Sequence, residues 1–210
     1  RTHKPSVKNY KHKGIPVMLQ QTVALFSLIL ISPLFLLVLC LIKIESSGSA
    51  LFSQTRVGEN GRHFKMYKFR SMYVKSDLKY KEPDPSQSSR EGVCKKYIND
   101  PRITIIGQFI RRYSIDEIPQ LFNIIRGDMC LVGPRPALSI EAYEYDRFVQ
   151  PRLFTKPGLT GLWQVSGRAD TNFEQQLQLD KTYIKQQSFF MDCKIIALTI
   201  PAVLTAKGAY

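Results

Sequence analysis

One long apolar segment constrains this chain more than any other feature. No charged residue occurs from Ile15 to Ile42, and the part from Val23 onward is almost wholly apolar. About 20 apolar residues in an α-helix cover the roughly 30 Å hydrocarbon layer of a bilayer. The segment is too long for the core of a signal peptide, and no small-residue cleavage site follows it. It therefore predicts a membrane helix.

A Ser-Pro pair lies in the middle of this segment. Proline removes one backbone hydrogen bond and clashes with the preceding turn, so Ser32-Pro33 predicts a kink. The Ser32 hydroxyl can donate to a carbonyl that the proline leaves free. These residues leave two arrangements open: a kinked helix that crosses the bilayer, or a re-entrant helix that bends at Ser32-Pro33 and leaves on the side it entered.

Basic residues flank the segment on both sides. Residues 1–14 form a basic arm, and further cations follow the segment: Lys43, Arg56, Arg62, Lys65 and Lys68. Because cytoplasmic flanks of membrane segments carry an excess of positive charge, both ends are expected on the cytoplasmic side. A re-entrant segment over residues 15–44 satisfies this, and residues 45–210 are then long enough for one folded domain.

The charge of the chain points to an anionic partner. The 210 residues carry a formal net charge of +13, with a pI of about 9.7. Nucleic acid, anionic lipid and phosphorylated small molecules all fit that charge. The cysteines are scattered, without a CxxC pair or a histidine cluster nearby. This argues against a disulfide framework or a zinc site and suits a reducing compartment.

A β-hairpin is predicted directly after the apolar segment. Residues 51–57 and 63–72 are rich in aromatic and β-branched residues, and Asn60-Gly61 between them is a strong turn signal. The two-residue period of a strand puts Lys68 and Arg70 on one face, as either a phosphate contact or a solvated strand face. The polar, proline-punctuated residues 74–98 are predicted to be a mobile insert. They lack the aromatic interleaving of a platform for single-stranded nucleic acid.

The central stretch SIDEIPQLFNIIRGDMCLVGPRP contains two adjacent carboxylates, Asp116 and Glu117. Helices are predicted over residues 103–112 and from about residue 114 to 126. Asp116 would then lie at the positive end of the second helix, which keeps it ionised and favours a phosphate beside it. Glu117 fits either a capping box with Ser114 or a chemical role.

These acids are suited to phosphoryl transfer. An ionised aspartate can attack phosphorus and form an acyl phosphate. Because aspartate and phosphate repel each other, cations must screen them: Arg111, Arg135 and a Mg²⁺ held by carboxylate and substrate phosphates. Pro134 and Pro136 fix the backbone on either side of Arg135, so its guanidinium has little entropy left to lose. The stretch predicts phosphoryl transfer at a membrane surface.

Two further helices and a turn-rich loop are predicted downstream. The helices cover residues 139–148 and residues 171–186, the second opened by a capping box between Thr171 and Glu174. After the glycine-rich loop KPGLTG and the segment LWQV, Arg168 is either a phosphate or sugar contact or part of an ordinary tight turn. The apolar C-terminal segment is interrupted by charge and proline. It suits a helix in the membrane interface or one that packs on the core.

Three motifs together resemble a known family. The central stretch, the upstream YKFRSM and the downstream KPGLTGLWQVSGR are similar to those of bacterial sugar transferases, the monotopic polyprenyl-phosphate phosphoglycosyl transferases. The resemblance covers nearly the whole chain from about Val17, including the Ser-Pro break and the GAY ending. NDPRIT and LTGLWQVSGRAD look most like undecaprenyl-phosphate galactose or glucose phosphotransferases. Their full chains carry further transmembrane helices upstream, so this chain is expected to be the catalytic part.

The resemblance implies a reaction in two steps. Asp116 attacks the sugar-linked phosphate of UDP-galactose or UDP-glucose and releases UMP. Undecaprenyl phosphate then attacks the phosphosugar on the enzyme and gives undecaprenyl diphosphate sugar. Glu117 is implied as a base or metal-positioning group, and Mg²⁺ as a cofactor held by Asp116 and Glu117. The implied substrate contacts are Lys68, Arg70, Arg111, Pro134, Arg135, Pro136 and Arg168.

The expected fold is α+β and mostly helical. A basic arm (1–14) precedes a re-entrant membrane helix (15–44) with its break at Ser32-Pro33. A catalytic domain (45–210) with an insert at about 74–98, a small β-hairpin and amphipathic interfacial helices follows.

The expected location is the cytoplasmic face of the bacterial inner membrane. The expected partners are the UDP-sugar, undecaprenyl phosphate and membrane lipid, without nucleic acid, and a homo-oligomer remains open. The product would serve exopolysaccharide, capsule or O-antigen synthesis. The alternative is a basic membrane-anchored binding module for anionic lipid or nucleic acid, which gives the paired acids and the GPRP motif no role.

Overall fold

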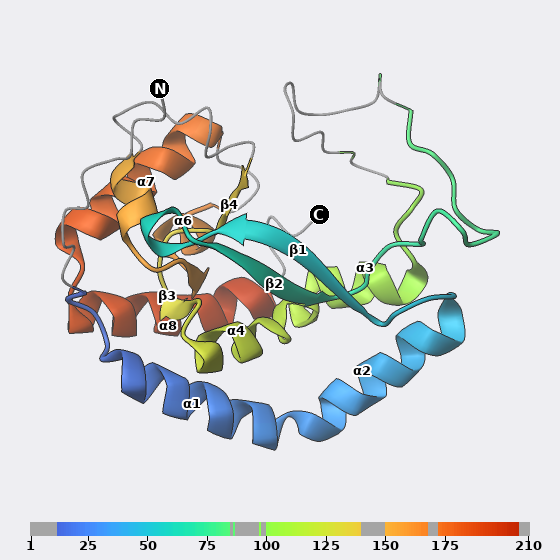
Figure 1. Ribbon diagram of the computed structural model, residues 1–210, viewed down its shortest axis with the longest axis horizontal. Helices are drawn as coiled ribbons and strands as arrows, with labels where there is room; N and C mark the ends of the chain where they lie inside the picture. Colours follow the sequence, from blue (N-terminus) through green and yellow to red (C-terminus); the bar gives the residue numbers. More distant parts are fainter. Residues whose placement is uncertain are drawn as a thin grey trace.

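A bent pair of helices forms one edge of the molecule, α1 (Val17–Leu30) and α2 (Ser32–Glu45) (Figure 1). The computed structural model describes residues 12–84, 86, 97, 100–139, 150–167 and 172–205. By length and composition, no single helix in these ranges could cross a bilayer. The two helices taken together could do so, as a broken span or as a re-entrant loop.

The predicted kink is confirmed at Ser32-Pro33. Only Ile31 separates the two helices, which are bent by 63°. Pro33 has no N–H for the carbonyl of Ile29 four residues earlier, and the Ser32 hydroxyl donates to that carbonyl at 2.8 Å. The serine thus replaces the hydrogen bond that the proline removes.

One face of the helix pair packs on the rest of the chain, and the other is apolar and exposed. Ala24 belongs to the core beneath α1, and Val38 and Ile42 to the core beneath α2. Large apolar side chains on the outer face are mostly exposed: Met18, Phe26, Ile29, Leu30, Leu36 and Ile44. An exposed apolar surface of this kind marks contact with lipid or protein.

The predicted hairpin is confirmed as β1 (Leu51–Val57) and β2 (His63–Phe69), which pair antiparallel from Leu51↔Phe69 to Val57↔His63. The second strand ends at Phe69, three residues before the predicted end. The turn contains η1 (Glu59–Gly61), where Asn60 and Gly61 both have positive φ. On its other edge, β1 pairs with β4 (Ala137–Leu138).

Three short helical elements follow: α3 (Ile105–Arg112), η3 (Ile115–Glu117) and α4 (Gln120–Arg126). The Thr104 side chain caps α3 by accepting from the Gly107 N–H at 2.8 Å. Gly107 lets α3 lie against the backbone at Ser71, because a Cβ there would overlap the Ser71 carbonyl. Close packing at Gly107 fixes α3 against the end of the hairpin.

A small parallel sheet leads into the GPRP motif. β3 (Cys130–Val132) pairs with β5 (Gly158–Thr160), with Val132 opposite Thr160. Chain segments η4 (Gln150–Phe154) and α6 (Leu162–Val165) lie on either side of β5 in the sequence. Since the motif joins β3 to β4, it is held between the two sheets.

The C-terminal helices are α7 (Phe173–Gln186) and α8 (Phe189–Leu204). The predicted capping box at Thr171 was one residue out of register. Asn172 is the N-cap, and its side chain and that of Gln175 bond to each other's backbone N–H. The cap falls there because the Asn172 backbone is extended (φ −73°, ψ 168°), the conformation of an N-cap.

Helix α8 packs on the core, one of the two roles left open by its sequence, and its place in the membrane interface stays a prediction. Asp192 and Ile195 are buried against the domain, while Phe190 and Leu204 are 83% and 69% exposed. The helix therefore packs on the core with one side and presents an apolar surface with the other.

Buried hydrogen bonds join the start of α1 to the C-terminal helices and to β3. The Asp192 carboxylate accepts from the Ile15 N–H at 2.8 Å and from the Tyr183 hydroxyl at 2.8 Å. The Gln20 amide donates to the Ile15 carbonyl and accepts from the Leu131 N–H, both at 2.6 Å. These contacts fix the position of α1 relative to β3, the strand that precedes the GPRP motif.

The expected α+β, mostly helical fold with a small hairpin is confirmed in these coarse terms. Residues 140–148 of the helix predicted over 139–148, and residues 85, 87–96 and 98 of the insert predicted at 74–98, lie outside the described residues. The domain boundaries at residues 14 and 44 stay predictions.

Candidate active site

Strand β2 directs Lys68 inward. Alternate residues of a strand share a face, and Phe64 and Met66 on the same face as Lys68 are buried core residues. Lys68 is the last of this row, where the core ends and a cavity begins. Its side chain is 18% exposed.

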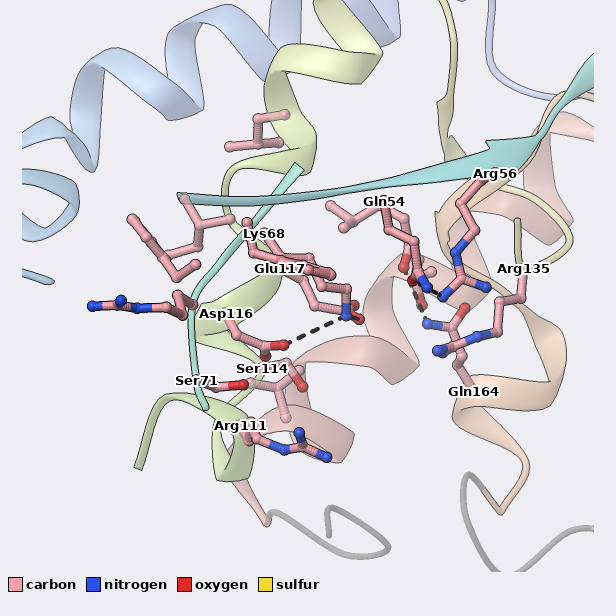
Figure 2. Close-up of a pocket in the computed structure, with 18 of the residues that line it drawn as sticks. Gln54, Arg56, Lys68, Ser71, Arg111, Ser114, Asp116, Glu117, Arg135 and Gln164 are labelled. Carbon is pink, nitrogen blue, oxygen red and sulfur yellow. Dashed lines mark hydrogen bonds and ion pairs between the residues drawn. The ribbon is translucent and has the colours of Figure 1, made fainter. Parts of the chain in front are cut away.

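The Lys68 ammonium bridges the two adjacent acids (Figure 2). Its Nζ lies 2.6 Å from a carboxylate oxygen of Glu117 and 3.4 Å from one of Asp116. Both acids come from η3, a single 3₁₀ turn between α3 and α4. The structure thus brings together the strand lysine and the two central acids that the sequence placed on separate elements.

The predicted helix from about residue 114 is split in two, and the capping box is not formed. Ser114 has φ 54°, in the left-handed region, and its side chain caps no backbone N–H. Helix α4 begins only after Pro119, because proline is accommodated at a helix start but not within one. Glu117 is therefore turned toward Lys68 instead of closing a capping box.

Burial, and not the end of a helix, dominates the ionisation of Asp116. Burial raises the pKa of the Asp116 carboxyl, and the neighbouring Glu117 charge raises it further. The positive charges of Lys68 and Arg111 lower that pKa. The prediction that a helix dipole keeps Asp116 ionised is wrong, since α4 starts four residues later and the screening comes from side-chain cations.

A cavity of about 1350 Å³ opens beside these acids. Its polar end is lined by the predicted cations Lys68, Arg111 and Arg135 together with both acids. In Figure 2, Arg111 and Lys68 lie on different sides of Asp116, and Arg135 lies across the cavity. Arg111 owes this position to the last turn of α3.

Arg135 rests on an aromatic ring that the sequence did not single out. Its guanidinium lies 5.6 Å from the ring centroid of Trp163 in α6, a cation–π contact. The two flanking prolines anchor the motif through their carbonyls. Pro134 accepts from the Gly158 N–H at 2.9 Å, and Pro136 from Arg56 at 3.3 Å.

A buried ion pair between Arg152 and Asp180 contacts the backbone of Arg135. The Arg152 guanidinium donates to the Arg135 carbonyl at 3.0 Å and lies 2.8 Å from the Asp180 carboxylate. Burial raises the pKa of Asp180 to about 6, and the positive charges of Arg152 and Arg135 oppose that rise. No pattern in the sequence distinguished Arg152 or Asp180 from neighbouring polar residues.

Two of the predicted substrate contacts, Arg70 and Arg168, are not brought to the acids in the described structure. The Arg70 guanidinium donates to the carbonyls of Ser46 and Ser47 at the end of α2, and burial lowers its pKa. It therefore fixes the helix pair to the hairpin, although it also lines the cavity. Arg168 lies outside the described residues.

Paired acids bridged by a lysine, with arginines in the same cavity, are suited to binding a phosphorylated, anionic substrate. Residues 12–206 match the sequence profile described as "Bacterial sugar transferase", and the chain belongs to this family. The protein is thus an enzyme, and the resemblance seen in its motifs is confirmed.

Several known proteins are similar to this chain. The exopolysaccharide production protein ExoY of Rhizobium meliloti is 43% identical over 189 residues, covering 88% of this chain and 83% of ExoY. The undecaprenyl-phosphate galactose phosphotransferase of Salmonella typhimurium is 44% identical over 169 residues, covering 79% of this chain and 36% of the relative. The UDP-glucose:undecaprenyl-phosphate glucose-1-phosphate transferase of Caulobacter vibrioides is 42% identical over 189 residues, covering 86% of this chain and 66% of the relative.

Proposed function

We propose that this chain transfers a hexose 1-phosphate from UDP-galactose or UDP-glucose to undecaprenyl phosphate, giving undecaprenyl diphosphate sugar and UMP. The observation that carries the proposal is the Lys68 bridge between Asp116 and Glu117 in a cavity that also contains Arg111. The names of the Salmonella and Caulobacter relatives support this class of substrate. The ExoY relative supports a role in making an exopolysaccharide.

In the first step, a carboxylate oxygen of Asp116 attacks the phosphorus that carries the sugar. The bond from this phosphorus to the bridging oxygen breaks, and UMP leaves with the electron pair. Asp116 must be ionised to attack, and Lys68 and Arg111 favour that form. The same cations offset the negative charge that accumulates as two anions approach.

In the second step, a phosphate oxygen of the lipid attacks the same phosphorus. The bond to Asp116 breaks, and the aspartate is regained as a carboxylate. Glu117, the neighbour of Asp116 in η3, accepts a proton from the lipid phosphate in this proposal. Arg135, held by Trp163 and Arg152, is positioned to contact a phosphate or the nucleotide.

Asp116 and Glu117 are the residues that would hold a Mg²⁺ ion. Their carboxylate oxygens already converge on one cation, the Lys68 ammonium, and Mg²⁺ prefers such oxygen ligands. In the described part of the chain, no group of three or more His, Cys, Asp or Glu residues could hold a metal. The remaining ligands would be substrate phosphates and water. When bound, the ion neutralises charge on the diphosphate.

The bent helix pair supports attachment to the membrane as a re-entrant element. Its outer face is apolar, and basic residues flank both of its ends. With both ends on the cytoplasmic side of the inner membrane, the cavity lies where a lipid phosphate meets a soluble nucleotide sugar.

The test is UMP release from a panel of UDP-sugars, with and without undecaprenyl phosphate. We expect Asp116→Asn to abolish release, while Ser139→Ala, directly after the edge strand β4, retains it. Intact-mass analysis of wild-type protein mixed with UDP-sugar alone should show a phosphosugar adduct whose mass identifies the hexose class. UMP release that requires the lipid and leaves no adduct would exclude the covalent mechanism.

A further inference from the structure

The cavity continues beyond the acids into an apolar end between α1 and α8. This end is lined by apolar side chains of the two helices: Val23, Ile196, Ile200, Val203 and Leu204. Leu131 of β3 and Leu159 of β5 line the region between. Charged and apolar walls thus belong to one continuous space.

This space is larger than a nucleotide sugar requires, and one end of it is apolar. Pockets for a single small molecule are typically about 300–1000 Å³, and this cavity measures about 1350 Å³. A nucleotide sugar is polar along its whole length, so it would gain nothing from the apolar end. A ligand with an anionic head and an apolar chain matches both ends at once.

Two hydroxyl groups at the junction already have hydrogen-bond partners. The hydroxyls of Thr160 and Thr199 lie 2.8 Å apart, and Thr199 donates to the Ile195 carbonyl at 2.7 Å. These groups therefore do not require water, and an apolar chain can pass them without leaving them unpaired.

The apolar end is also continuous with the exposed apolar surface of both helices. Ile200 and Leu204 line the cavity and are 60% and 69% exposed, and Phe26 on α1 is 67% exposed. A lipid chain can therefore reach the cavity along exposed apolar side chains of α1 and α8.

We propose that the space between α1 and α8 binds the isoprene units of the lipid acceptor nearest its phosphate, with that phosphate at the Lys68 end. This rests on the proposed function, since it assigns the second substrate of the same site. The neighbouring apolar residues select an isoprenoid chain by burying it next to the reacting phosphate.

Groove-filling substitutions test the assignment. Val203 and Ser27 are half-buried and line the cavity, so Val203→Phe and Ser27→Phe would occupy the space of the chain. Leu198→Phe on α8 and Leu25→Phe on α1 are matched controls, because both positions are exposed and outside the cavity lining. Undecaprenyl phosphate and farnesyl phosphate are the acceptor probes.

We expect the two groove variants to raise the acceptor KM about tenfold or more for both probes. Single-turnover UMP release from the UDP-sugar should stay within about twofold of wild type, since the first step does not use the groove. Unchanged acceptor KM values in well-folded variants would overturn the assignment. An equal loss in UMP release would also overturn it, because the groove would then serve the nucleotide sugar.

Photolabelling separates this assignment from the proposed reaction. Wild-type protein in detergent is irradiated with farnesyl phosphate that carries a diazirine in its isoprene chain, and the labelled peptides are sequenced. Labels within residues 23–27 or 196–204 support the groove even if no UMP is released. Labels confined to other segments would refute it even if transfer to lipid phosphate is observed.

Discussion

The Lys68 ammonium lies closer to Glu117, at 2.6 Å, than to Asp116, at 3.4 Å. The side chains of Lys68, Asp116 and Glu117 are only 18%, 13% and 20% exposed. Two carboxylates in such a site cannot easily ionise together without a cation between them. Lys68 thus favours the ionised form of Asp116 beside Glu117, which the proposed nucleophilic role of Asp116 requires.

Removal of this cation should shift the pH dependence of the first step. Lys68 lowers the pKa of Asp116, so Lys68→Met should raise that pKa, and the acid limb of the rate profile should move to higher pH. At neutral pH we expect the single-turnover rate of UMP release to fall about 100-fold. Lys65→Met is the control, since Lys65 lies exposed on the opposite face of β2. An unshifted acid limb would show that Lys68 does not act on Asp116.

Local chemistry explains which elements could be predicted from the sequence. The break at Ser32-Pro33 depends on a missing N–H and a nearby hydroxyl, and the hairpin turn depends on Asn60-Gly61. Both effects act within a few residues. At Ser114 two local signals compete, the capping box and the proline five residues later, and the left-handed backbone at Ser114 resolves them in favour of a split helix.

Partners distant in the sequence could not be predicted in this way. The motif suggested that Arg135 is held rigidly, but its ring partner Trp163 and its support by Arg152 depend on the packing of separate elements. Asp180 lies within the polar helix α7, where an aspartate usually faces solvent. Asp180 is buried because α7 packs against η4, and the sequence alone does not show that contact.

The Asp180 carboxyl should make folding stability depend on pH. Its folded-state pKa of about 6 lies above the ordinary aspartate value, so the fold binds this proton more tightly than the unfolded chain does. The unfolding free energy should therefore rise as the pH is lowered from 7 towards 4, by about 3 kcal/mol at most from this group. Asp180→Asn should remove that part of the pH dependence. Melting temperatures of both proteins are measured in detergent from pH 7 to pH 4. The same pH dependence in wild type and Asp180→Asn would contradict this prediction.

Asn123 should be required for the position of Lys68. This fully buried side chain accepts from the Tyr67 N–H at 3.1 Å and donates to the Lys65 carbonyl at 2.7 Å. Asn123→Leu would leave both backbone groups unpaired, so we expect a loss of about 3 kcal/mol in unfolding free energy. Thr22→Val, on the exposed face of α1, is the control and should melt as wild type does. Equal melting temperatures for the two variants would count against this role.

The bent helix pair should enter and leave the membrane on the same side. In a background without native cysteines, Lys13→Cys and Ile44→Cys test the two ends, which are both exposed. We expect both to react with a membrane-impermeant maleimide in inside-out vesicles and neither to react in right-side-out vesicles. Leu30→Cys, 81% exposed at the bend, should stay unlabelled in both because the proposed re-entrant arrangement puts it in the hydrocarbon layer. Labelling of positions 13 and 44 from opposite sides would instead establish a kinked span, because Ser32 satisfies the Ile29 carbonyl in either arrangement.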